Sequence, residues 1–188
     1  MKWWWILIAL LAAVAGFVVV RGLERLIQEP SDAEETPEIA PGTALRTVQL
    51  FFGSPDRVAF LTEERAIVDP ESKEDLAEEI VRLVLEGPTR GVTGLPPATK
   101  VRTLYIADDG VVYLDLSSEL LMSWPVGDGL EWVSLGSLVR SLTDNVPSLR
   151  AVQILIDGHV VAKPPGSIPL DLPLEPEWFG ATPAEVIR

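Results

Sequence analysis

The chain has 188 residues, a formal net charge of −13 and no cysteine. The missing cysteines exclude disulfides, thiolate metal sites, a cysteine nucleophile and lipid attachment at an N-terminal cysteine of this sequence. The acidic charge repels nucleic acid and anionic lipid headgroups, so we expect no nucleic-acid partner. Beyond an apolar segment and an acidic one at the start, about 130 to 140 residues remain, which suits one domain.

An uncharged apolar run begins at the third residue. Residues 3–20 carry no charge and start with three tryptophans. A helix over this run, rising about 1.5 Å per residue, would span about 27 Å, close to the hydrocarbon core of a bilayer. We therefore expect residues 1–21 to form an N-terminal transmembrane anchor. The alternative is a cleaved signal peptide, because residues 13–15 resemble a small-residue cleavage site.

The charges around the run point in both directions. Lys2 favours an inside N-terminus, whereas Arg21 favours the reverse. Because short N-terminal anchors usually keep the N-terminus inside, we expect a single-pass protein of the cell membrane with an extracytoplasmic C-terminal domain. Residues 22–46 are acidic, contain prolines and have few large apolar side chains. This composition predicts an extended linker between the anchor and the domain.

The folded domain is expected at residues 47–172. Alternating apolar residues within 47–52, a Gly-Ser-Pro-Asp turn and a second strand expected at residues 58–68 predict a β-hairpin. A helix is predicted to start at Asp69, with proline at its first position and acids in its first turn. Gly87 and the proline after it end this helix. The core-facing positions have helical spacing: Leu76, Ile80, Leu83 and Val84.

Two further strands are predicted at residues 101–106 and 111–116, joined by the tight turn at residues 108–110. A short helix is expected at residues 119–122, capped by Ser117 or by the serine after it. A second long helix is predicted from about residue 128 to the residues before Pro147. Its core-facing residues would be Leu130, Val133, Leu138, Val139 and Leu142.

The last predicted hairpin joins residues 151–156 to a return strand at residues 159–162. Residues 173–188 are expected to be a C-terminal tail. Hairpins interleaved with two amphipathic helices predict an α+β domain of two layers, in which one sheet carries both helices on one face. The proline-rich residues after the last hairpin are expected to dock onto the domain through Leu170, Leu172, Leu174 and Trp178.

Few residues have the pattern of a catalytic or metal site. His159 is the one histidine in the sequence, and nothing near it in sequence would orient it as a base. Acids gather around the first helix and could hold a cation or a partner, but acids near a helix start are typical of a solvated face. We predict no catalytic residue, no metal and no cofactor. The acids are Glu63, Glu64, Glu71, Glu74, Asp75, Glu78 and Glu79.

Asp115 and two tryptophans are the candidates for a binding site. Strand alternation places Asp115 on the face of Tyr113, where its carboxylate could line a groove. Alternatively, Asp115 accepts hydrogen bonds from the backbone of residues 117–119 and fixes the turn. Trp124 and Trp132 flank a glycine-rich loop that could bind a sugar or a partner, although such aromatics more often hold a loop against the core.

Six sequence blocks, in order, resemble the GerMN domain, the sporulation and spore germination domain. They are residues 83–88, 94–97, 101–106, 112–117, 138–143 and 152–158, and together they cover roughly residues 47–172. The Gly-Pro at the helix end, the Pro-Pro after a loop, and the Asp-Leu-Ser and Asp-Gly turns are the most distinctive.

The resemblance implies an extracytoplasmic, membrane-attached domain of envelope or sporulation proteins, acting through contacts with other proteins or with itself. It implies no catalytic residue, because none is established for the family. The chain departs from the pattern in having one copy of the domain and an apolar anchor in place of a lipidated cysteine. The candidate interaction or structural positions are Asp115, Ser117, Trp124, Trp132, Asp157 and Gly158.

The leading hypothesis is a membrane-anchored, non-catalytic interaction domain of the cell envelope. The rival is an envelope carbohydrate-binding protein or hydrolase that uses Asp115 and the loop from Trp124 to Trp132. A third hypothesis is a scaffold that self-associates through exposed hairpin edges.

Overall fold

The computed structural model describes residues 44–122, 124, 129–162, 164, 166 and 168–180. The expected anchor, nearly all of the expected linker and the last eight residues of the expected tail lie outside this part of the chain. Among the helices of the described residues, none has the length and apolar character that a membrane span requires.

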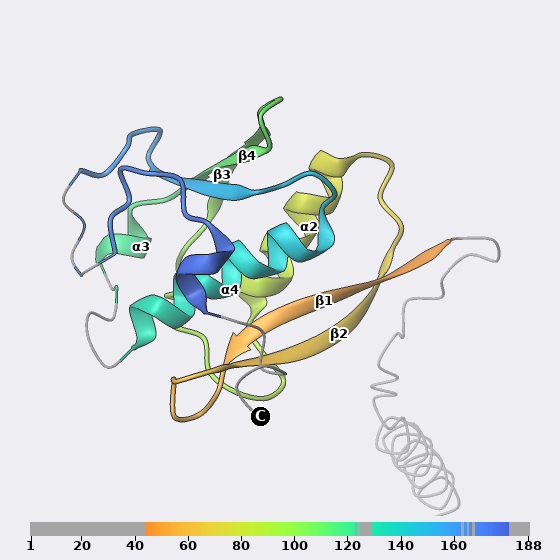
Figure 1. Cartoon of the computed structure of the whole chain (residues 1–188), viewed down its shortest axis with the longest axis horizontal. Coiled ribbons are helices and arrows are strands. Elements are labelled where there is room, and N and C mark those ends of the chain that lie inside the picture. The colour runs from red at the N-terminus through yellow and green to blue at the C-terminus, as the bar shows by residue number, and fades with distance from the viewer. Residues whose placement is uncertain are drawn as a thin grey trace, which may run out of the picture. The chain divides into compact units, whose positions relative to one another are not determined.

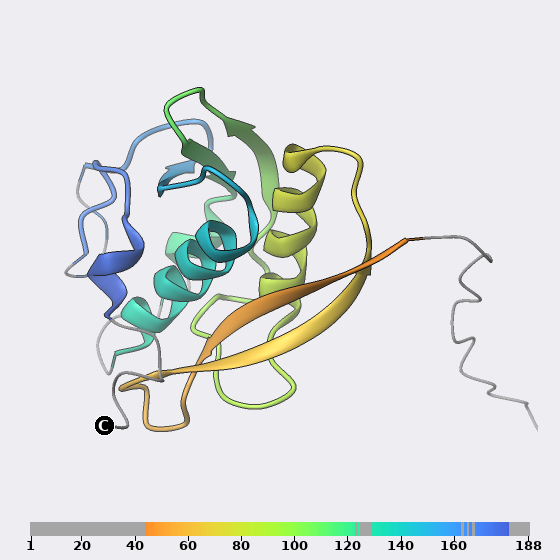
Figure 2. The same cartoon turned by 45° about the vertical axis from the view of Figure 1, so that its right-hand side comes forward.

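The domain contains two sheets with helices between them. One sheet is β1-β2, and the other has the order β3-β4-β5. In Figures 1 and 2 the helices α2 and α4 lie between these sheets, and α4 contacts both β1 and β5. The α+β class is confirmed, whereas the single sheet with both helices on one face is wrong. The elements are β1 (Leu45–Gly53), β2 (Phe60–Val68), α2 (Lys73–Glu86), β3 (Val101–Ile106), β4 (Val111–Leu116), α3 (Glu119–Met122), α4 (Leu130–Asn145), β5 (Ala151–Ile156) and η1 (Pro176–Phe179).

The first sheet is the predicted hairpin. β1 and β2 pair antiparallel from Leu45 opposite Val68 to Gly53 opposite Phe60. The pairing extends one step further, because the Asp69 amide donates to the Ala44 carbonyl at 2.9 Å. Asp69 therefore belongs to the end of the hairpin, and the prediction that it starts the helix is wrong.

Helix α2 begins after Ser72 instead. The Ser72 hydroxyl accepts a hydrogen bond from the Asp75 amide at 3.0 Å and donates to the Asp75 carboxylate at 2.7 Å. These bonds satisfy one of the free amides of the first turn. Gly87 ends the helix with a φ of 90°, as predicted. All four predicted core-facing residues of α2 are buried.

The second sheet pairs strands in two ways. β3 and β4 form the predicted antiparallel hairpin, but β4 and β5 are parallel, so α4 belongs to the crossover that joins them. The predicted return strand at 159–162 is reduced to a single bridge between Ile156 and His159. Leu174 takes its place, because its backbone exchanges hydrogen bonds of 2.9 and 2.8 Å with Val152.

Helix α4 is buried on almost every side. Four of the five residues predicted to face the core are buried, and the opposite face is buried as well. That face carries small residues, including Gly136 and Ser141, and it packs against β1. The Ser141 hydroxyl accepts a hydrogen bond from the Phe51 amide at 3.0 Å, and Asn145 exchanges bonds of 2.9 and 2.7 Å with Gln49. A helix that is buried on both faces must be covered on each side, and here α4 contacts β1 of one sheet, β5 of the other, and α2 and η1.

The Gly136→Ala variant is expected to be less stable than the parent chain, although alanine favours helix by about 1 kcal/mol. A Cβ at Gly136 would overlap the Phe60 ring and lie 2.9 Å from Phe179 Cδ1. Overpacking of this kind costs about 1–3 kcal/mol. The control is Ser137→Ala, whose buried hydroxyl has no partner among the described residues, so its loss should be neutral or stabilising. Thermal unfolding, followed by circular dichroism, measures both melting temperatures. A higher melting temperature for Gly136→Ala than for the parent chain would contradict the close packing of Phe60 and Phe179 on α4.

The C-terminal segment closes the domain. Leu170 and Leu174 are buried, as predicted, whereas Leu172 and Trp178 are largely exposed. Phe179 is fully buried instead of its neighbour Trp178. The short helix η1 places Phe179 against the Trp132 ring, with 6.3 Å between the ring centroids.

Candidate functional site

Asp115 lies near the end of β4 and is 9 % exposed. Its Oδ1 accepts a hydrogen bond from the Gly158 amide at 2.7 Å, and its Oδ2 accepts one from Arg102 Nε at 3.2 Å. The second Arg102 nitrogen, Nη1, binds the Asp157 carboxylate at 3.1 Å. The structure thus brings three of the candidate residues together around an arginine that the sequence did not single out.

This cluster holds the turn after β5 against the end of β4. Asp157 and Gly158 have φ values of 49° and 78°, the left-handed conformation of a two-residue hairpin turn. The Asp157 amide donates to the Leu116 carbonyl at 3.0 Å. Asp115 therefore fixes a turn by accepting a backbone hydrogen bond, and its backbone partner is Gly158 in place of residues 117–119. Neither carboxylate oxygen of Asp115 is left without a donor.

Ser117 connects the same end of the sheet to β3. Its hydroxyl accepts a hydrogen bond from the Lys100 amide at 3.0 Å, and its amide donates to the Lys100 carbonyl at 3.0 Å. A hydrogen bond from Ser117 also lowers the pKa of the Glu119 carboxyl. These bonds join the start of β3 to the start of α3, so Ser117 has a structural role.

The two tryptophans occupy separate environments. Trp124 is 7 % exposed and belongs to the hydrophobic core. Trp132, on α4, is half-buried and packs against the Phe60 ring with 4.5 Å between ring centroids. No ring contact between the two tryptophans occurs within the described part of the chain, and residues 125–128 of the expected loop lie outside it.

Several of the predicted acids are engaged in ion pairs. Glu63 binds Arg65 at 2.6 Å and accepts hydrogen bonds from Thr89. Hydrogen bonds from Arg82 are the main cause of the lowered pKa of the Glu79 carboxyl. Within the described residues, no group of three or more acidic or histidine side chains could hold a metal ion. His159 is exposed and its Nδ1 lies 2.7 Å from the Asp157 carbonyl oxygen.

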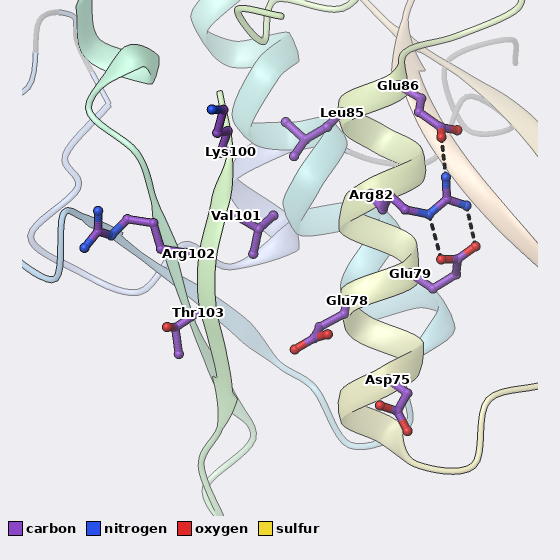
Figure 3. A pocket seen from close by; sticks show the side chains of 10 residues that line it. All are labelled: Asp75, Glu78, Glu79, Arg82, Leu85, Glu86, Lys100, Val101, Arg102 and Thr103. Atoms are coloured by element: carbon purple, nitrogen blue, oxygen red, sulfur yellow. Dashed lines mark hydrogen bonds and ion pairs between the residues drawn. The ribbon is translucent and has the colours of Figure 1, made fainter. Parts of the chain in front are cut away.

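A groove of about 800 Å³ separates α2 from β3. Figure 3 shows Leu85 and Val101 pointing toward one another across it, with Glu78 directed toward β3. Arg102 and Thr103 point to the other side of the strand. The sequence indicated the acids of α2 but gave no sign that β3 would lie opposite them. The lining residues are Asp75, Glu78, Glu79, Arg82, Leu85, Glu86, Lys100, Val101, Arg102 and Thr103.

A family model named Germane, described as sporulation and spore germination, matches residues 49–162. The chain belongs to the Germane family. The matched residues run from within β1 to just beyond the Asp157-Gly158 turn, so the Germane region contains both the Arg102 cluster and the groove. The segment 168–180, which closes the domain, follows the matched region.

Solved structures share the Germane fold. A protein of Clostridium perfringens, provisionally described as a lipoprotein, is 22 % identical with a TM-score of 0.50; the match covers 71 % of this chain and 89 % of that one. The tandem GerMN domains of the sporulation protein GerM from Bacillus subtilis are 21 % identical with a TM-score of 0.52, covering 70 % of this chain and 46 % of that one. This chain therefore spans less than half of the tandem structure. No curated protein matches significantly.

Proposed function

We propose that the chain is a membrane-anchored, non-catalytic interaction domain that works outside the cytoplasm, in assemblies of envelope or sporulation proteins. Membership of the Germane family, whose description is sporulation and spore germination, is the observation that carries this proposal. The uncharged run at residues 3–20 supports contact with the membrane. The net charge of −13 argues against a nucleic-acid partner.

The described contacts favour binding over catalysis. The two oxygens of Asp115 are used by Arg102 and Gly158, and a general base needs a free acceptor aimed at substrate. Trp132 packs in an aromatic cluster with Phe60 and Phe179. The rival, a carbohydrate binder or hydrolase built on Asp115 and the two tryptophans, therefore has less support.

The location of the domain can be tested by chemical labelling, because the sequence has no cysteine. Asp108 is exposed in the turn between β3 and β4, so the full-length Asp108→Cys variant should react with a membrane-impermeant maleimide in intact cells. The matched control is a chain with one cysteine inserted directly after Met1, which keeps Lys2 and should react only after the cells are permeabilised.

Two results would contradict the proposed location. Labelling of Asp108→Cys only after permeabilisation would place the domain in the cytoplasm. Recovery of the labelled domain from the medium, shortened at its N-terminus, would show that the apolar run is a cleaved signal peptide and not an anchor.

A further inference from the structure

The outer edges of β1 and β5 are covered. Ser141 and Asn145 of α4 bind the backbone of Phe51 and Gln49 along β1, and Val92 bridges its last residue, Gly53. The outer edge of β5 is bridged by Leu174. Within the described residues, β3 pairs with β4 alone, so its other edge is available to a partner.

The available edge of β3 borders the groove between β3 and α2. The pairing between β3 and β4 shifts register after Val101, and Arg102 has no partner opposite it in β4. A bulge of this kind twists an edge and hinders long strand-to-strand pairing. The edge therefore suits a short extended segment better than a full strand from a second copy of the chain.

The groove has an apolar floor and an acidic wall. Leu85 and Val101 are half-buried and form the floor. The α2 wall carries four carboxylates and one guanidinium, that of Arg82, which is turned toward Glu79 and Glu86 (Figure 3). Glu78 is exposed, and within the described part of the chain its carboxylate has no hydrogen bond or ion pair.

The positive groups of the opposite wall are largely occupied or peripheral. Arg102 is bound to Asp115 and Asp157 and points away from α2. Lys100 lies near the Leu85 end of the groove, whereas Glu78 lies toward the other end (Figure 3). The groove is thus negative along the stretch between Glu78 and β3, where a cation would meet an uncompensated carboxylate.

We propose that this groove binds a short, extended, basic segment of another protein, with an apolar side chain on Leu85 and Val101 and a lysine or arginine beside Glu78. The inference rests on the proposed interaction function and names the surface and the chemistry of the partner. Backbone groups along the edge of β3 would bind the segment, and the side chains would set its specificity. A second copy of this chain fits poorly, because both copies would be strongly acidic.

Fluorescence anisotropy with a defined probe tests the proposal. The probe is a labelled peptide with the repeat Val-Thr-Lys-Thr. In an extended chain every second side chain points the same way, so valine and lysine share one face and threonine occupies the other. The full-length chain, in neutral detergent micelles, should bind this peptide saturably. The same peptide with glutamate in place of lysine should not bind.

The matched pair of variants is Glu78→Lys and Glu71→Lys. Both reverse one exposed charge near α2, but Glu71 does not line the groove. Because charges beyond about 8 Å are screened at physiological salt, the two variants differ mainly at the groove. Glu78→Lys should weaken binding at least about fivefold, whereas Glu71→Lys should change it less than about twofold. Both variants should keep the parent melting temperature.

Three outcomes would overturn the proposal. Equal weakening by both variants would show only general attraction between opposite charges. Absence of saturable binding would show that the groove does not accept a basic segment. A dimer of the chain that is lost in Glu78→Lys would assign the groove to a second copy. In each case the labelling of Asp108→Cys still reports the location of the domain independently.

Discussion

The Phe60→Ala variant is expected to be destabilised by about 3–5 kcal/mol, because the phenyl ring is buried where the hairpin meets α4. Phe60 is 2 % exposed. Its ring packs 4.5 Å from the Trp132 ring and lies 5.3 Å from the Arg140 guanidinium carbon, centroid to atom. It also fills the space that Gly136 leaves on α4. Removing the ring opens a cavity between β2 and α4, and the buried Arg140 guanidinium loses its contact with the Phe60 ring.

The loss should appear as a fall in melting temperature of roughly 10 °C. The matched control is Leu61→Ala, the next residue of β2, which is 39 % exposed and should cost less than about 1 kcal/mol. Unfolding by urea gives the two free energies on one scale. Similar losses for both variants would mean that Phe60 does not fill the junction between the hairpin and α4.

The second large effect is expected for Asp115→Ala, at about 2–3 kcal/mol. The change leaves the Gly158 amide without its acceptor and removes one of the two carboxylates that hold Arg102. Because Arg102 is half exposed and can be solvated, most of the loss is assigned to the hydrogen bond between the charged carboxylate and the Gly158 amide, which holds the turn.

Asp115→Asn separates the structural role from the rival catalytic one. Asparagine retains an oxygen that can accept from Gly158 but loses the charge that attracts Arg102, so the expected loss is only about 1 kcal/mol. A graded series in urea unfolding, with the parent most stable and alanine least, supports the structural role. A parent-like stability in both variants, together with loss of turnover of a wall-derived substrate, would favour a hydrolase.

Local patterns in the sequence predicted most elements of the fold. The alternation in β1, the turn that follows it, the apolar spacing of α2 and the glycine that ends α2 each depend on neighbouring residues. The misplaced start of α2 arose because Asp69 and Ser72 are both good N-caps, and only the pairing of Asp69 with Ala44 across the hairpin decides between them.

Local sequence patterns could not predict the number of sheets. It depends on α4 being buried on both faces, and the second face consists of small residues such as Gly136 and Ser141, which carry little hydrophobic signal. Leu174 takes the place of the expected return strand beside β5, and neighbouring residues encode neither this contact nor the parallel pairing of β5 with β4. The partner on the outer edge of β5, Leu174, lies far along the chain in a proline-rich segment.

The candidate residues were easier to find than their partners. Asp115, Asp157 and Gly158 were all singled out from the sequence, but Arg102, which binds both carboxylates, was not. Its position follows from the pairing of β3 with β4 and from the parallel alignment of β4 with β5. The groove likewise depends on α2 lying beside β3, a contact between elements that no local pattern encodes.

The most direct test of an outward-facing interaction domain is photo-crosslinking in living cells. A benzophenone amino acid replaces Lys100, which is exposed and lines the groove, and in a control chain it replaces Asp108 in the β3–β4 turn. We predict a covalent adduct with another envelope protein from position 100, absent from position 108 and lost when Glu78→Lys is added. No adduct from position 100, in cells where Asp108→Cys is labelled from outside, would contradict a binding role for the groove.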